Sequence, residues 1–254
     1  MKIDPNKSLV QSYPDLNFES AFLSNDSLYG VESELMSYHN RKFNRYVAIW
    51  EYGHYFISLA ISRSSVHKSY ITIAALITEA HSALRGSFLL NLKGWHSDSI
   101  VLLRKVHESL IRAMACKANP KKTWNFIQSS GIQKAEHSIG LDLKELYNIE
   151  SSYSHSNRLK VFKSGIDLKS GKDKISVSYG PQQDEKEFGL AASISIFWVY
   201  VAIKILPKLL PNQLSKYWMS KYDQSAQLMK DYIETTGSDL IKKIDEFDSC
   251  LTKI

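Results

Sequence analysis

The sequence predicts an all-α protein, a helical bundle with a small loop or β-hairpin insertion. Glycine and proline are scarce, at 11 and 6 of 254 residues, which favours long helices. Apolar residues recur at helical spacing over most of the chain, and residues 157–183 interrupt this pattern. With 44% hydrophobic and 23% charged residues, the chain can bury a large core. We expect an irregular N-terminal arm over residues 1–27 and a single helical domain over residues 28–254.

Turn and capping residues divide the helical pattern. Gly94 interrupts it, and Ser97 or Asp98 can cap the helix that follows. Asn119 and Pro120 end that helix, because the residue before a proline disfavours the helical conformation. Helices are expected at about 31–61, 69–92, 97–117, 123–129, 133 or 141–155, 184–209, 212–235 and 238–251.

The most apolar stretch, residues 189–207, is interpreted as a buried central helix. Its uninterrupted apolar part ends at Lys204, short of the ~20 residues that a membrane span needs. The N-terminus lacks the apolar core of a signal peptide. Cys116 and Cys250 have no spacing that suggests a metal site or a disulfide framework. We therefore expect a cytoplasmic protein that has no membrane partner, metal or cofactor.

The segment at residues 157–183 has a different composition. Its glycines and the alternation in KISVSY predict a small β-hairpin or an ordered loop. Across residues 157–176, six basic residues oppose two acidic ones, which concentrates most of the chain's net charge of +6 in this basic insertion. Both a solvated hairpin tip and a phosphate-binding surface fit this composition.

Two helices carry polar residues at intervals of four, which places each row along one edge of its helix. A surface ion pair at this spacing contributes only about 0.2–0.5 kcal/mol, so stability alone hardly explains the rows. If the two helices pack together, the rows face each other. The rows are Arg104, Glu108 and Arg112 in one helix, and Tyr147, Ser151 and His155 in the other.

Facing rows allow a structural and a catalytic interpretation. In the first, they form an interhelical hydrogen-bond network that fixes helix register, with Glu108 or Glu150 as the partner of a buried guanidinium. In the second, His155 exchanges protons at neutral pH and an arginine stabilises a phosphorane-like transition state. Both interpretations stay open at this point.

At these residues the chain resembles bacterial all-helical proteins of the HEPN-like type. Their pattern is an R-x-x-x-E helix after a glycine-containing turn, followed by a Y-x-x-x-S-x-x-x-H helix, and the resemblance covers roughly residues 70–210. The active motif of the family's ribonucleases is R-N-x-x-x-H. Aligned on His155, this chain has Ser151 in place of the asparagine and Glu150 in place of the arginine, so a catalytic arginine is expected from elsewhere.

The resemblance implies an RNA-directed effector, a metal-independent endoribonuclease that acts in anti-phage defence or a toxin–antitoxin system, as a homo-oligomer or with a partner protein. In that role His155 is the general base or acid for attack by the 2′-hydroxyl, Arg104 clamps the phosphate and Glu108 orients one of them. The alternative is a non-catalytic accessory or scaffold that binds a partner protein or nucleic acid. The implied site residues are His155, Arg104, Glu108, Tyr147 and Ser151, and the residues expected to contact RNA are Arg158, Lys160, Lys163 and Arg112.

Overall fold

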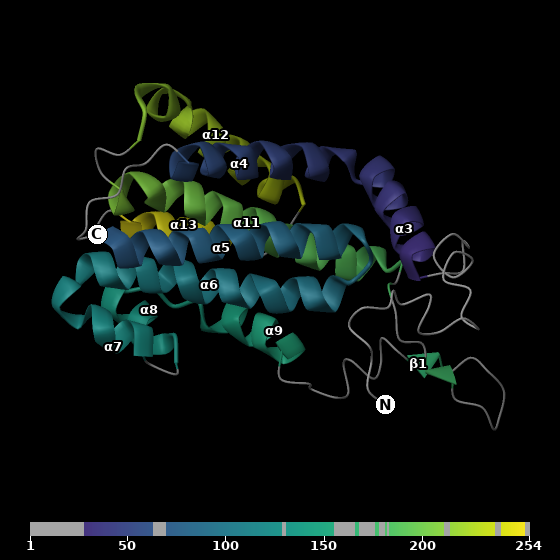
Figure 1. Ribbon diagram of the computed structural model, residues 1–254, viewed down its shortest axis with the longest axis horizontal. Coiled ribbons are helices and arrows are strands. Elements are labelled where there is room, and N and C mark those ends of the chain that lie inside the picture. Colours follow the sequence, from purple (N-terminus) through teal and green to yellow (C-terminus); the bar gives the residue numbers. More distant parts are fainter. Residues whose placement is uncertain are drawn as a thin grey trace, which may run out of the picture.

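The computed structural model describes residues 28–62, 70–128, 131–154, 166–167, 176–177, 181, 183–210, 214–236 and 240–251. Nearly all of them lie in helices, which confirms the all-α bundle (Figure 1). The elements are α3 (Leu28–Lys42), α4 (Asn44–Ser62), α5 (Ile71–Leu92), α6 (His96–Ala118), η2 (Pro120–Lys122), α7 (Thr123–Gln128), α8 (Gln133–Ile139), α9 (Lys144–Ser154), β1 (Ile166–Asp167), β2 (Ser176–Val177), α11 (Glu185–Leu209), α12 (Lys216–Thr235) and α13 (Leu240–Leu251).

The first long helix expected, over residues 31–61, is in fact two helices. The chain changes direction at Phe43, and α3 tilts away from the bundle at one end (Figure 1). At the bend the rings of His39 and Phe43 stack on Phe188 of α11, with centroids 4.5 and 4.2 Å apart. Because an apolar period is the same in a straight and a bent helix, the sequence pattern does not reveal this break.

The cap expected at Ser97 or Asp98 is wrong, because α6 already begins at His96. Gly94 has a φ of 87°, a left-handed conformation that favours glycine, and it closes the tight turn between α5 and α6. Trp95, whose indole has no acceptor oxygen, occupies the N-cap position.

A second glycine separates α8 from α9. Gly140 has a φ of 73° and ends α8 as a left-handed C-cap. A helix does begin at Gln133, but it ends at Ile139, so one continuous helix from residue 133 is wrong. The helix that reaches Ser154 is α9, which begins at Lys144, close to the other expected start at Leu141. The backbone N–H of Lys144 donates to the side chain of Asp142 at 3.2 Å.

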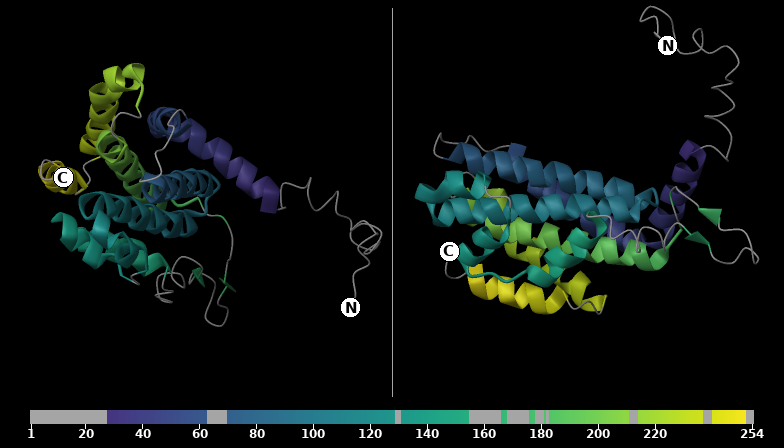
Figure 2. Two further views of the ribbon diagram at one scale, coloured as in Figure 1. Left: turned by 60° about the vertical axis from the view of Figure 1, so that its left-hand side comes forward. Right: turned by 90° about the horizontal axis from the view of Figure 1, so that it is seen from below.

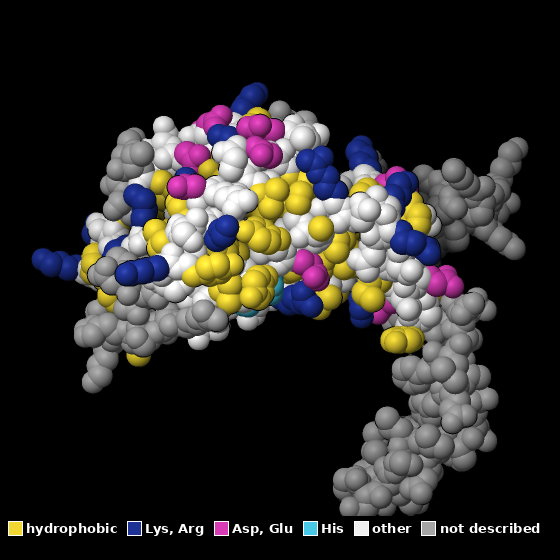
Figure 3. All heavy atoms as spheres, turned by 90° about the horizontal axis from the view of Figure 1, so that it is seen from above, with side chains coloured by type: hydrophobic (Ala, Val, Ile, Leu, Met, Phe, Trp, Pro, Cys, Tyr) yellow, Lys and Arg dark blue, Asp and Glu magenta, His cyan; other side chains and the backbone are white. Residues whose placement is uncertain are grey.

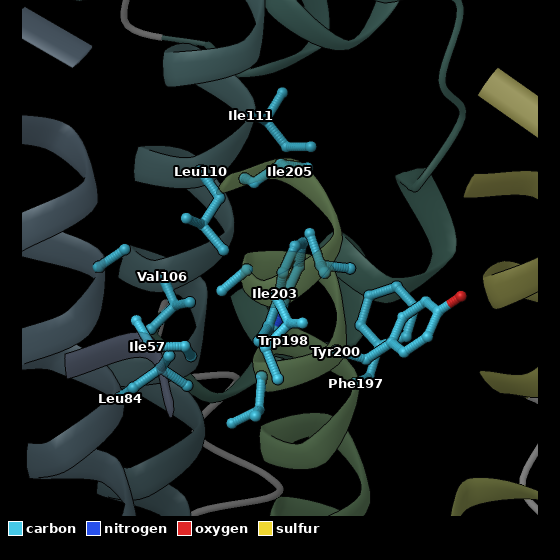
Figure 4. Packing of buried hydrophobic residues seen from close by; sticks show 14 of the residues in the cluster. Ile57, Leu84, Val106, Leu110, Ile111, Phe197, Trp198, Tyr200, Ile203 and Ile205 are labelled. Atoms are coloured by element: carbon cyan, nitrogen blue, oxygen red, sulfur yellow. The ribbon is translucent and has the colours of Figure 1, made fainter. Parts of the chain in front are cut away.

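The central element of the bundle is α11. It contacts α4, α5, α6, α12 and α13, and it lies in the middle of the bundle in Figure 2. Figure 4 shows its side chains, Trp198 and Ile203 among them, packing against Val106 and Leu110 of α6. Asp184 caps the helix by accepting from two backbone N–H groups. By length and composition α11 could cross a membrane, yet 78% of its most apolar window is buried inside the structure, as expected for residues 189–207.

Helix α4 approaches α11 and α12 at Gly53. A Cβ atom added to this glycine would lie 2.5 Å from Cγ1 of Val199 and 3.1 Å from Cε of Met229. Only a residue without a side chain allows the three helices to pack this closely.

The expected insertion contains a short antiparallel pair of strands, in which Ile166 pairs with Val177. The remainder of the insertion up to Gly180, and the predicted arm at residues 1–27, lie outside the described residues. Elsewhere the surface keeps some apolar side chains exposed, including Tyr55 of α4 and Tyr217 of α12. Figure 3 shows such side chains gathered in the middle of one face, with charged residues around them.

Candidate functional site

The two polar rows meet where α6 packs against α9. Arg104 donates from Nη2 to the hydroxyl of Tyr147 at 2.7 Å and from Nε to Oε1 of Glu108 at 3.1 Å. The Tyr147 hydroxyl in turn donates to the same Glu108 oxygen at 3.2 Å. The guanidinium carbon of Arg104 lies 5.0 Å from the Tyr147 ring centroid, which adds a cation–π contact. The expected facing of these three residues is therefore present.

Arg112 completes what we call the α6–α9 cluster, which consists of Arg104, Glu108, Arg112 and Tyr147. Nη2 of Arg112 lies 3.4 Å from Oε2 of Glu108, so one carboxylate holds two guanidinium groups. Because the cluster has two cations and one anion, its net charge is +1. The side chains of Arg104, Glu108 and Arg112 are 20%, 22% and 19% exposed, so the cluster is packed and still reaches solvent.

The rest of the predicted site lies further along the second row. The hydroxyl oxygen of Ser151, one helical turn after Tyr147, is buried. His155, Arg158, Lys160 and Lys163 lie outside the described residues.

Behind the cluster lies a buried ionic group that the sequence analysis missed. His107 of α6 lies between two carboxylates, with Nδ1 2.8 Å from Oε2 of Glu150 and Nε2 2.9 Å from Oε1 of Glu136. The other oxygen of Glu150 accepts from Nε1 of Trp198 at 2.8 Å. We call His107, Glu136 and Glu150 the buried triad, which joins α6 to both α8 and α9.

The triad holds a charged histidine in the core. Burial on its own disfavours the imidazolium, but the carboxylates of Glu150 and Glu136 outweigh it and raise the pKa of His107 to about 9. The ring is therefore protonated at neutral pH and donates from both nitrogens. It also packs edge-on against Tyr147, with centroids 5.4 Å apart, so the triad supports the cluster from behind.

The position of Glu150 answers one question that the sequence left open. This residue stands where the HEPN ribonuclease motif has arginine, and its side chain points into the core toward His107 and Trp198. The sequence offered it as a second partner for a buried guanidinium, but its partners are an imidazolium and an indole. Its occurrence in the apolar arc of its own helix was the signal that it is buried.

Among the described residues, no group of three or more His, Cys, Asp or Glu side chains could hold a metal ion. Cys116 and Cys250 are buried thiols, and the thiol of Cys250 donates to the carbonyl oxygen of Ile139 at 2.8 Å.

Comparison of the chain with models of protein families, with curated proteins and with solved structures finds no match. The functional assignment therefore depends on the geometry of the α6–α9 cluster and on the motif spacing.

Proposed function

We propose that the chain is an RNA-directed effector of HEPN-like type and that the α6–α9 cluster binds a phosphate group of the RNA. The observation that carries the proposal is the 2.7 Å contact between Arg104 and Tyr147, which brings the two polar rows together. Because the cluster carries a net positive charge and stays partly exposed, it suits an anionic ligand. Arginine is also the side chain best matched to phosphate geometry.

The residue types of this cluster and His155 support metal-independent cleavage. The ribose 2′-oxygen attacks the phosphorus while its proton passes to His155, which follows Ser151 by one helical turn in the sequence. The bond from phosphorus to the 5′-oxygen breaks, and that oxygen leaves with a proton taken from water. Arg104 stabilises the negative charge that develops on the non-bridging oxygens, with Glu108 holding the guanidinium in place. The products are a 2′,3′-cyclic phosphate and a 5′-hydroxyl.

A non-catalytic accessory role in a defence complex is the second candidate. Two observations favour it: Glu108 already neutralises part of the charge of both arginines, and the position of the family's catalytic arginine holds the buried Glu150. In this role the cluster fixes the register of α6 and α9. The resemblance places either function in the bacterial cytoplasm, in an anti-phage or toxin–antitoxin system, as a homo-oligomer or with a partner protein.

An RNA cleavage assay tests the catalytic proposal. Purified wild-type protein and the His155→Ala and Arg104→Ala variants are incubated with total RNA or tRNA in EDTA. We expect cleavage by the wild type and a loss of about 100-fold or more in the His155→Ala variant. His137→Ala and Arg85→Ala, which change exposed residues on α8 and α5, are the matched controls and should cleave as the wild type does.

The same variants decide between the two candidates. If folded wild-type protein and the His155→Ala variant both leave RNA intact, the ribonuclease proposal is wrong. A sharp drop in the melting temperature of Arg104→Ala would then assign the cluster to structure, because Glu108 would lose its closer cation.

A further inference from the structure

A second basic surface lies at the far end of α6 from the α5–α6 turn. Residues 117–134, counted with both ends, include four lysines and no aspartate or glutamate. This stretch forms the end of α6, the 3₁₀ turn η2, α7 and the start of α8, which lie together at one end of the bundle (Figure 1). Lys121 and Lys122 are exposed, and among the described residues neither forms an ion pair.

Trp124 is exposed in the middle of this stretch. Its side chain is 65% exposed, whereas Trp50, Trp198 and Trp218 are fully buried. The local packing explains its direction. Phe126 anchors α7 in the core, and residues two apart on an α-helix lie about 200° apart, so Trp124 must point outward. The exposed face of this indole is available to stack with an aromatic ring of a ligand.

Lys117, in the last turn of α6, borders this surface. Its ammonium lies 4.6 Å from the ring centroid of Tyr70, which holds the side chain against the bundle. On α6 it follows Arg112 by five residues, about 7.5 Å along the helix axis.

We propose that η2 and α7 bind single-stranded nucleic acid, with a base stacked on Trp124 and phosphates held by Lys121 and Lys122. Sites of this kind combine a basic path for the backbone with exposed aromatic rings on which bases stack. A base in a duplex keeps its faces covered by its neighbours, so the surface selects single strands. The inference rests on the proposed function and names the form of RNA that the protein recognises.

The test separates binding from cleavage by using two probes. A short oligodeoxythymidine cannot be cleaved by 2′-hydroxyl attack, and an oligouridine of the same length reports on RNA. Binding should quench tryptophan fluorescence in the wild type, since the described tryptophans other than Trp124 are buried or partly buried. Trp124→Ala should lose the quenching and bind both oligomers about 5- to 150-fold more weakly in fluorescence anisotropy. Tyr217→Ala, an equally exposed aromatic on α12, is the control and should bind as the wild type does.

The salt dependence of binding tests whether Lys121 and Lys122 contact phosphates. The double variant Lys121→Gln and Lys122→Gln should lower the slope of log Kd against log salt by about 1.4, because two phosphate contacts are lost. Changing the exposed Lys216 and Lys242 to glutamine, on α12 and α13, should leave the slope unchanged.

The proposal is overturned if neither oligomer binds at low salt. It is also overturned if Trp124→Ala binds like the wild type, or if a duplex binds as tightly as a single strand. Binding that depends on Trp124 without any RNA cleavage would support this surface and contradict the ribonuclease proposal alone.

Discussion

Nδ1 of His107 lies 2.8 Å from Oε2 of Glu150, and neither side chain reaches solvent. One buried ion pair therefore links α6 to α9 directly beneath the contact between Arg104 and Tyr147. Because Oε1 of Glu136 accepts a hydrogen bond from Nε2 of the same ring, His107 joins α6, α8 and α9.

Removal of His107 should destabilise the protein strongly. His107→Ala leaves two carboxylates buried without their cation, so we expect the free energy of unfolding to fall by about 3–5 kcal/mol. Urea denaturation measures the change. His137→Ala removes an exposed histidine from α8 and should alter stability by about 0.5 kcal/mol or less. Equal effects of the two substitutions would show that the triad contributes nothing specific.

The triad also makes stability depend on pH in the alkaline range. The pKa of His107 is raised from 6.5 to about 9 by its carboxylates, so the folded state binds the proton more tightly than the unfolded state does. The resulting stabilisation is complete below pH 6.5 and is lost as the pH rises through 9, by about 3 kcal/mol in total. An NMR titration of the His107 ring and urea unfolding at several pH values check this. A ring that titrates near pH 6.5 would contradict it.

His54 and His81 should make the folded state less stable at acidic pH, whereas His107 makes it less stable at alkaline pH. Their rings stack with centroids 4.3 Å apart between α4 and α5. Burial, the neighbouring His81 and the cation of Arg85 lower the pKa of His54 to about 4. Burial and Arg85 also lower the pKa of His81. The unfolded state therefore binds more protons below pH 6.5, and stability should fall as the pH drops from 6.5 toward 4.

A substitution of Arg85 tests the cause of these lowered values. Arg85→Ala removes a cation near both rings, so the pKa of His54 and that of His81 should move up toward 6.5. NMR titration of the two rings measures the movement. Arg45→Ala, which removes an arginine lying over the Tyr232 ring, is the control and should leave both pKa values unchanged.

Gly53→Ala should destabilise the contact of α4 with α11 and α12. The new methyl group would lie 2.5 Å from Cγ1 of Val199, and overpacking of this kind costs about 1–3 kcal/mol. We expect a lower melting temperature, with partial recovery when Val199→Ala is added. Gly189→Ala on α11 is the matched control, because its Cβ would meet nothing within 4 Å. That change should be neutral or stabilise the helix by up to about 1 kcal/mol.

Much of the fold can be predicted from local patterns. The apolar run at residues 189–207 correctly indicates the central helix α11, because a helix that is apolar on all sides must be covered on all sides. The bend at Phe43 could not be predicted, since the ring of Phe43 packs there on Phe188, which lies far away in the sequence. The start of α6 at His96 was also not predicted. The prediction looked for a capping side chain, whereas the helix follows a turn at Gly94 and has no side-chain cap.

In the candidate site, too, contacts set by local spacing could be predicted, and contacts between distant segments could not. Spacing within two helices predicts that Arg104, Glu108 and Tyr147 meet, and they do. The role of His107 needs acids from two other helices to converge on it, and the helical period says nothing about such convergence. The predicted role of His155 remains a prediction, as this residue lies outside the described part of the chain.

The position of α11 in the chain has a consequence for how the protein is made. Helices α4, α5 and α6 pack against α11, yet the ribosome synthesises α11 after all three. Until that helix emerges, the nascent chain holds three apolar faces that have nothing to cover them. Folding of the bundle is therefore completed late in translation, and chains that stop before residue 185 should bind chaperones or aggregate.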